Sequence, residues 1–131
     1  MKNLLLILTV ISLNVSASPT ISEVYNECIK QGLLAPYIVT AQSIQECGWH
    51  YESANARNNN NLFGLTKPDG SGYFKFDTWQ ESVTGYRDMV QYKLRRDEGY
   101  YDFLKRIGYA SDPKYEDKVR WIVKRLINKN L

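Results

Sequence analysis

The chain has 131 residues, of which 17 are basic and 14 acidic, and its formal net charge is +3. This length suits one domain with one hydrophobic core, and a small positive excess without a run of Lys or Arg excludes a strong nucleic-acid footprint. The single histidine, His50, leaves too few imidazoles for a zinc site or a Ser–His–Asp triad, and there is no glycine-rich phosphate loop. No metal and no cofactor is therefore expected.

The N-terminal segment has the pattern of a cleaved signal peptide. Lys2 precedes an apolar run over residues 4–13, and residues 15–17 (Val-Ser-Ala) place small side chains where signal peptidase accepts them. A run of this length spans only about half of a bilayer core. We predict a signal peptide over residues 1–17, a catalytic domain over 18–131, no stable membrane span after cleavage, and export to the periplasm or the extracellular space. The alternative is a buried first helix of the domain.

The rest of the chain divides into helices, separated by residues that end or begin them. Thr20 and Glu23 have the spacing of a capping box, Gly32 suits a helix end, and Pro36 suits a helix start. We expect helices over about 20–32, 36–47, 78–94, 100–107 and 115–127, a loop over 49–61, and a cramped hairpin formed by 62–65 and 73–76. The pattern predicts a mainly α domain with four or five helices and at most one short β-hairpin.

The second predicted helix carries the residue with the most telling chemistry. Its apolar residues spread around the whole circumference at 100° per residue, which indicates a central, buried helix. Glu46 falls beside Val39 near the helix end, and Trp49 follows. Loss of hydration there would raise the pKa of the carboxyl group, as a proton donor in glycoside cleavage requires. A solvated glutamate at a frayed helix end is the second interpretation that periodicity leaves open.

Four segments resemble, in order, the motifs of one family. Residues 41–49 (AQSIQECGW) resemble AQAxLESGW, residues 60–64 are NNLFG, residues 76–86 (FDTWQESVTGY) resemble Y-x-S/T-W-x-E-S-I-x-D-Y, and residues 108–115 (GYASDPKY) resemble GYATDPxY. The family is glycoside hydrolase family seventy-three, the peptidoglycan endo-beta-N-acetylglucosaminidases, which include autolysins and the flagellar rod-cap hydrolase. Its domains are also described as mannosyl-glycoprotein endo-beta-N-acetylglucosaminidase-like.

The resemblance implies a lysozyme-like helical fold and hydrolysis of the glycosidic bond on the reducing side of N-acetylglucosamine in peptidoglycan. Glu46 matches the family's catalytic acid, and Tyr109 matches a tyrosine placed near that acid. Further residues expected to bind the substrate are Gln42, Trp49, Asn61, Phe63, Tyr86 and Tyr115. The expected partner is the peptidoglycan glycan strand, with no nucleic acid, and the expected state is a monomer.

The chain departs from the family where a second carboxylate is expected. Larger members carry it on an extended β-lobe, whereas here only nine residues separate Gly64 from Phe74, with Asp69 the sole carboxylate among them. Asp69 also suits a turn, and Glu52 is a further candidate. We favour substrate assistance, in which the 2-acetamido group of the sugar attacks its own anomeric carbon and Glu46 supplies the proton.

Two other functions stay open at this point. A non-catalytic peptidoglycan-binding module would keep the aromatic cleft without depending on Glu46. A wall amidase is the other alternative, because that label is sometimes attached to the family.

The two cysteines would enter an oxidising compartment after export. On two antiparallel helices, Cys28 and Cys47 would be offset by about 10 Å or more along the helix axes, which is more than a disulfide spans. Two reduced, partly buried thiols are therefore favoured slightly over a disulfide.

Overall fold

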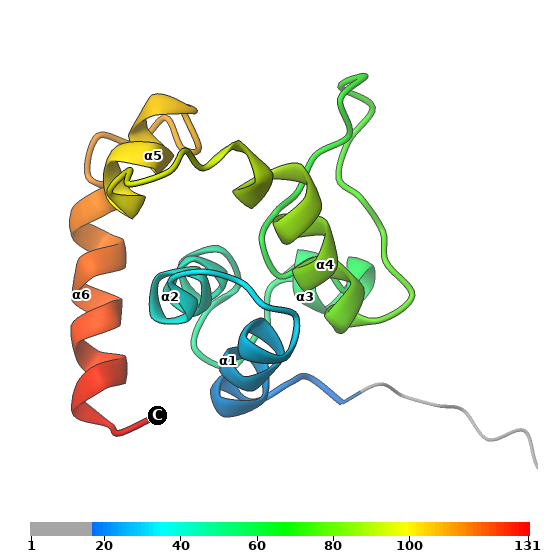
Figure 1. The fold of residues 1–131 in the computed structure, drawn as a ribbon. Coiled ribbons are helices and arrows are strands. Elements are labelled where there is room, and N and C mark those ends of the chain that lie inside the picture. The colour runs from blue at the N-terminus through cyan, green and yellow to red at the C-terminus, as the bar shows by residue number, and fades with distance from the viewer. Residues whose placement is uncertain (1–16) are drawn as a thin grey trace, which may run out of the picture.

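The computed structural model describes residues 17–131 (Figure 1). The predicted signal peptide lies outside this part of the chain, apart from Ala17. The described residues contain six α-helices and one 3-10 helix, and they contain no β-strand. The mainly α, lysozyme-like fold class is thereby confirmed. None of the helices in residues 17–131 has the length and apolar character that a membrane crossing needs.

The helix α2 (Pro36–Cys47) is central, packed between α1 (Ile21–Lys30) and α6 (Tyr115–Asn128), as Figure 1 shows. It begins after Ala35 with proline at its first position and ends at Gly48, which has a φ of +85° that favours glycine. Side chains on several of its faces are fully buried, including polar ones. Both ends agree with the predicted range.

Local capping sets the start of α1 and of α4 (Trp79–Met89). The Thr20 hydroxyl accepts a hydrogen bond from the backbone N of Glu23 (3.2 Å), and the Glu23 carboxylate accepts one from the backbone N of Thr20 (3.4 Å). Thr78 caps α4 in the same way, through the backbone N of Glu81 (3.3 Å). The Glu81 carboxylate, however, bonds the backbone N of the residue before Thr78. The first predicted capping box is complete and the second is half formed.

The predicted loop over 49–61 contains a short helix that the sequence analysis missed, α3 (Ala54–Asn59). Ser53 caps it by accepting a hydrogen bond from the backbone N of Ala56 (3.2 Å). Its six residues are alanine, asparagine and arginine, so no apolar period marks it. The described residues therefore hold six α-helices, and the predicted four or five is wrong.

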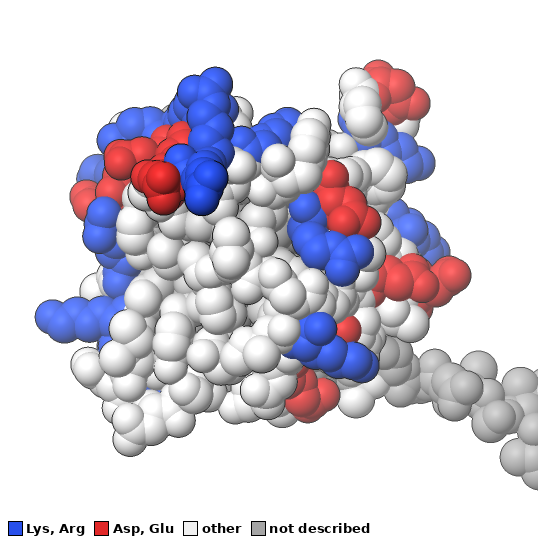
Figure 2. Space-filling view, in the orientation of Figure 1, with Lys and Arg blue, Asp and Glu red and all other residues white. Residues whose placement is uncertain are grey.

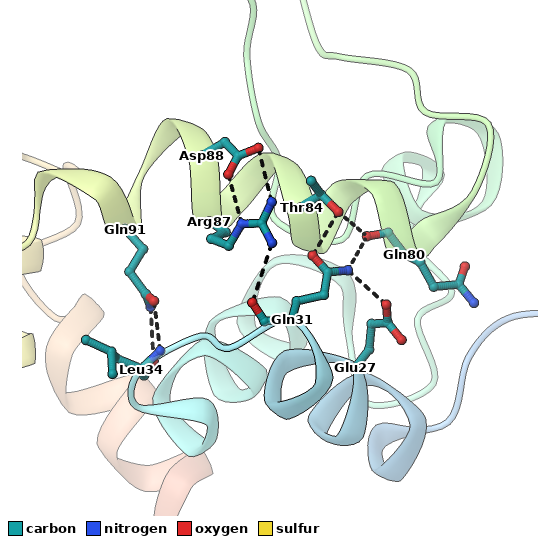
Figure 3. Close-up of polar contacts among 8 residues, drawn as sticks. All are labelled: Glu27, Gln31, Leu34, Gln80, Thr84, Arg87, Asp88 and Gln91. Carbon is teal, nitrogen blue, oxygen red and sulfur yellow. Dashed lines mark hydrogen bonds and ion pairs between the residues drawn. The ribbon is translucent and has the colours of Figure 1, made fainter.

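The helix predicted to continue to Leu94 stops earlier. α4 ends at Met89, and the chain tightens into the 3-10 helix η1 (Gln91–Lys93). The Gln91 amide explains the change, because it accepts a hydrogen bond from the backbone N of Leu34 (2.8 Å) and donates one to its O (3.0 Å). Figure 3 shows this tie from the end of α4 to the segment between α1 and α2.

The loop between α3 and α4 is a hairpin with one bridge and no regular strands. Thr66 and Tyr73 form a single antiparallel bridge. The Asp69 carboxylate accepts a hydrogen bond from the backbone N of Ser71 (2.9 Å), which closes the turn. The loop extends away from the helices in Figure 1, and it agrees with the prediction of at most one short hairpin.

α5 (Tyr100–Arg106) and α6 follow close to their predicted ranges. Val119, Ile122 and Leu126 of α6 are buried, and α6 packs against α2. On the face shown in Figure 2, Lys and Arg side chains gather over α5 and the adjoining end of α6, mixed with Asp and Glu, while the surface over α2 carries no charge. Charge of both signs therefore covers this end of the molecule.

Both cysteines are free and buried. Cys28 lies in α1, and Cys47 is the last residue of α2. Burial raises the pKa of the Cys28 thiol to about 12 and that of Cys47 to about 11, so both stay protonated and unreactive at neutral pH. The structure agrees with the reduced state favoured from the sequence.

Candidate active site

Glu46 lies in the last turn of α2, against the loop that follows α3. A Cβ atom on Gly64 would lie 3.0 Å from Oε2 of Glu46 and 3.6 Å from its Cδ, so the carboxyl group faces the Gly64 backbone closely. Gly64 has a φ of +62°, which side chains rarely adopt. Glycine at this position therefore lets the loop pass beside the carboxyl group.

The carboxyl group opens into a cleft of about 550 Å³ between the end of α2, the hairpin loop and the end of α4. This volume is within the range of small-molecule sites in proteins. The residues that line it are Glu46, Phe63, Gly64, Leu65, Thr66, Pro68, Asp88, Met89, Val90, Tyr92, Lys93 and Tyr109. The lining combines apolar side chains with polar ones in similar measure, and the Glu46 carboxyl group is among the polar groups.

Glu46 is exposed to solvent in this cleft, so the prediction of a buried glutamate is wrong. The cause is its place on α2: neighbouring helices cover the middle of α2, whereas its last turn forms a wall of the cleft. The surrounding walls, with Phe63 and Tyr109 among them, still remove part of the water, and this desolvation raises the pKa of Glu46. A substrate can thus reach a carboxyl group that stays protonated to a higher pH than an ordinary glutamate.

Tyr109, on the loop before α6, lines the same cleft. Its hydroxyl donates a hydrogen bond to the O of Phe63 (3.3 Å), and its ring packs against Tyr86 and Tyr115, with centroids 6.1 and 5.7 Å away. Desolvation, together with Tyr115 and Glu46 nearby, raises its pKa well above the ordinary value, so it remains a neutral phenol. The structure brings the two predicted catalytic residues to one cleft.

A buried chain of hydrogen bonds lies behind this cleft. Tyr86 has one hydroxyl proton, which it donates to Oε1 of Gln42, so Tyr100 donates to Tyr86 (2.7 Å). Gln91 in turn donates to Tyr100 (3.0 Å), and Nε2 of Gln42 donates to the hydroxyl of Tyr115 (3.2 Å). Each side chain therefore donates to the next in the order Gln91, Tyr100, Tyr86, Gln42 and Tyr115. Of the predicted substrate contacts, Gln42, Tyr86 and Tyr115 are buried in this chain, where they support the cleft rather than line it.

Asn61 supports the hairpin loop from within. Its side chain is fully buried, its amide donates to the O atoms of Leu65 (2.9 Å) and Phe74 (3.0 Å), and its Oδ1 accepts from the backbone N of Leu65 (2.9 Å). Phe63 is also buried, with its ring against Tyr86, although it forms part of the cleft wall. Asn61 holds the loop in which Gly64 faces Glu46.

Trp49 lies on the α6 side of α2, outside the cleft. Its ring contacts Trp121 edge to face, with centroids 6.3 Å apart at 77°. The two indoles line a separate hollow. Trp49 remains a predicted substrate contact only if the substrate also occupies that hollow.

Neither predicted second carboxylate lines the cleft. The Glu52 carboxylate accepts a hydrogen bond from the backbone N of His50 (3.0 Å) and lies against Gly48. Asp69 is exposed in its turn, where the hydrogen bond from Ser71 lowers its pKa. Both positions agree with local structural roles.

The carboxylate that does line the cleft with Glu46 is Asp88, which the sequence analysis missed. It pairs with Arg87 (2.8 Å between Nε and Oδ1), which lowers its pKa. Arg87 also donates to the O of Gln31 at the end of α1 (3.5 Å), as Figure 3 shows. Asp88 belongs to no matched motif, and only the fold places it at the cleft. The same holds for Tyr92 in η1, which also lines it.

Comparison with known proteins adds one finding. A family model described as glucosaminidase, mannosyl-glycoprotein endo-beta-N-acetylglucosaminidase, matches residues 22–128. This range contains Glu46, Tyr109 and every other residue that lines the cleft. No curated protein and no solved structure matches the chain.

Proposed function

The chain belongs to the glucosaminidase family, which makes it a glycoside hydrolase, and we propose that its substrate is the glycan strand of bacterial peptidoglycan. The bond cut is the one on the reducing side of N-acetylglucosamine. The observation that carries the proposal is the Glu46 carboxyl group, with its raised pKa, at the wall of an open cleft that Tyr109 also lines. The four motifs that resemble peptidoglycan glucosaminidases support the choice of this polymer over a glycoprotein glycan.

Glu46 acts as the general acid in this proposal. Its proton goes to the glycosidic oxygen as the bond from that oxygen to the anomeric carbon breaks. Desolvation by the cleft keeps the proton on the carboxyl group at the pH at which an ordinary glutamate is ionised. The resulting carboxylate then takes a proton from the water that completes hydrolysis.

Substrate assistance supplies the nucleophile. The carbonyl oxygen of the 2-acetamido group attacks the anomeric carbon, and the oxazolinium ion so formed is opened by water, with net retention of configuration. Two observations support this route: Glu52 and Asp69 lie outside the cleft lining, and Asp88 is already paired with Arg87. The neutral hydroxyl of Tyr109 is suited to orient the acetamido group.

The carboxylate variants test this route. Glu52→Gln and Asp69→Asn should each keep hydrolysis within about twofold of wild type, because both side chains have local structural roles outside the cleft. Asp88→Asn should cost less than about 10-fold, because it alters the cleft wall but removes no reacting group. Initial rates on purified peptidoglycan give the answer, with melting temperatures as the folding control. A loss of about 10³-fold in any one variant would identify a second catalytic carboxylate.

Mass spectrometry of the fragments that the purified protein releases from peptidoglycan tests the function itself. After borohydride reduction, N-acetylglucosaminitol at the fragment ends is the expected result, and it fixes the bond cut. N-acetylmuramitol would show cleavage of the other glycosidic bond, and free stem peptides would show amidase chemistry. Binding without fragments would leave a peptidoglycan-binding module.

Export belongs to the same proposal. Peptidoglycan lies outside the cytoplasmic membrane, so an enzyme that cuts it must leave the cytoplasm. The signal-peptide pattern over residues 1–17 supports export of the mature enzyme to the periplasm or the extracellular space.

A further inference from the structure

A second hollow, of about 580 Å³, lies between the last turn of α2 and α6. We name it the tryptophan hollow, and its defining residues are Gln45, Trp49, Lys114, Asp117, Lys118 and Trp121. We propose that it is a second glycan-binding site, which holds an anionic glycan strand outside the catalytic cleft. The proposal rests on the proposed function, because it takes peptidoglycan as the ligand.

Two indole rings give the hollow its shape. Trp121 is 54 % exposed on α6, and it meets Trp49 at an interplanar angle of 77°. Trp49 is half-buried and packs against the core, so the pair forms a concave corner in which Trp121 presents most of the exposed apolar surface. Sugar rings have apolar C–H faces of matching size, which pack against indole rings, while their hydroxyl groups stay in water.

Two cations without a carboxylate partner lie against the two rings, at the edge of the hollow and outside its lining. The Arg125 guanidinium lies 4.6 Å from the Trp121 centroid and 5.8 Å from that of Trp49, and Nζ of Lys129 lies 5.3 Å from the Trp49 centroid. Neither cation forms an ion pair with another residue in 17–131. The rings thus hold Arg125 while its N–H groups remain free to bind a carboxylate of a ligand.

The charged residues that line the hollow itself carry both signs. Lys118 is paired with Asp112 (2.6 Å), Lys114 has no ion pair among the described residues, and Asp117 is the one carboxylate in the lining. A neutral sugar would use only the indoles, whereas a strand with carboxylates would use the cations as well. Peptidoglycan has both features, because its muramic acid residues carry lactyl groups and stem peptides with carboxylates.

The hollow lies beside the catalytic cleft. Gln45 lines the hollow and Glu46 lines the cleft, and consecutive residues of a helix point about 100° apart. A strand cut in the cleft and a strand held in the hollow would therefore belong to the same wall surface. Such a second contact would keep the small enzyme on an insoluble polymer between cuts.

Pelleting with insoluble peptidoglycan tests the site, and a Glu46→Gln background prevents digestion during the measurement. Trp121→Ala and Arg125→Ala should each raise Kd by at least about fivefold. The matched controls are Ile127→Ala, 51 % exposed on the same helix, and the neighbouring charge variant Lys124→Ala. Both controls should stay within about twofold of the parent. The effect of Arg125→Ala should shrink at high salt.

Three other results of these experiments would overturn the proposal. If Trp121→Ala and Arg125→Ala bind like their controls, the hollow is not a glycan site. If these two variants bind a single-stranded oligonucleotide more weakly than the controls do, while their pelleting with peptidoglycan is unchanged, the proposal is overturned in favour of nucleic acid. If the parent protein forms a concentration-dependent dimer in sedimentation and the two variants do not, the proposal is overturned in favour of a second copy of the chain. Fragment release by the protein with Glu46 intact judges the proposed function separately, so the two failures are distinguishable.

Discussion

Glu46→Gln is expected to lower the rate of peptidoglycan hydrolysis by about 10³-fold or more, with the fold unchanged. Glutamine keeps the shape of the side chain and its fit against Gly64, but it has no proton to give to the glycosidic oxygen. Binding should survive, because the cleft walls stay in place. Initial rates of fragment release, measured beside a pelleting assay, separate the loss of chemistry from a loss of affinity.

The pH dependence of the wild type follows from the same group. Desolvation raises the pKa of Glu46 above its ordinary value of 4.5, and the reaction uses the protonated form. Activity should therefore decrease as the pH rises through this raised pKa. Substitutions that admit more water to the cleft should move the decrease to lower pH.

The stability of the Glu46→Gln variant gives a further check. A carboxyl group whose pKa is higher in the folded state favours folding below its unfolded pKa, and this contribution is lost as the pH rises through the folded pKa. Relative to wild type, the variant should thus be equally or more stable at neutral pH and lose this advantage below about pH 4.5. Glu52→Gln is the matched control, because it makes the same substitution at a glutamate that lies outside the cleft. Full activity of Glu46→Gln would remove the general acid from the mechanism.

Local signals explain why much of the fold follows from the sequence. The capping box at Thr20, the proline at Pro36 and the positive φ of Gly48 act within a few residues, so the boundaries of α1 and α2 were predictable. α3 has only Ser53 as a local signal and no apolar face. The early end of α4 depends on Gln91 reaching a distant backbone segment, which no local pattern encodes.

The residues of the candidate site show the same difference between features that the sequence predicts and features that depend on packing. The motifs that resemble the family led to Glu46 and Tyr109, and the fold brings both to one cleft. A motif does not distinguish a residue that contacts the ligand from one that supports the wall, so Gln42 was predicted as a contact although its amide is buried. Exposure of Glu46 and the presence of Asp88 both depend on how the helix ends pack, which periodicity does not describe.

Asn61→Ala is expected to lower the free energy of unfolding by about 2 to 4 kcal/mol. Alanine would leave two backbone groups without their partner, the N of Leu65 and the O of Phe74, while the O of Leu65 would lose one of its two donors and keep the backbone N of Phe74 (2.9 Å). The site is fully buried, so water cannot replace these hydrogen bonds without opening the loop. Urea denaturation gives the free energy, and Asn58→Ala, an exposed asparagine on α3, is the control with an expected change below about 0.5 kcal/mol.

Asn61→Asp separates the hydrogen bonds from the volume of the side chain. An aspartate could still accept from the backbone N of Leu65, but its second oxygen would face the two carbonyl groups that the amide now bonds. Burial and this repulsion raise the pKa of the new carboxyl group, so stability should be lost as the pH rises through that pKa and partly regained in acid, where a protonated oxygen can donate again. A variant equally stable at neutral and acidic pH would show that the amide donor is dispensable. Because the loop that Asn61 holds also places Gly64 against Glu46, hydrolysis should fall with the loop even while most molecules remain folded.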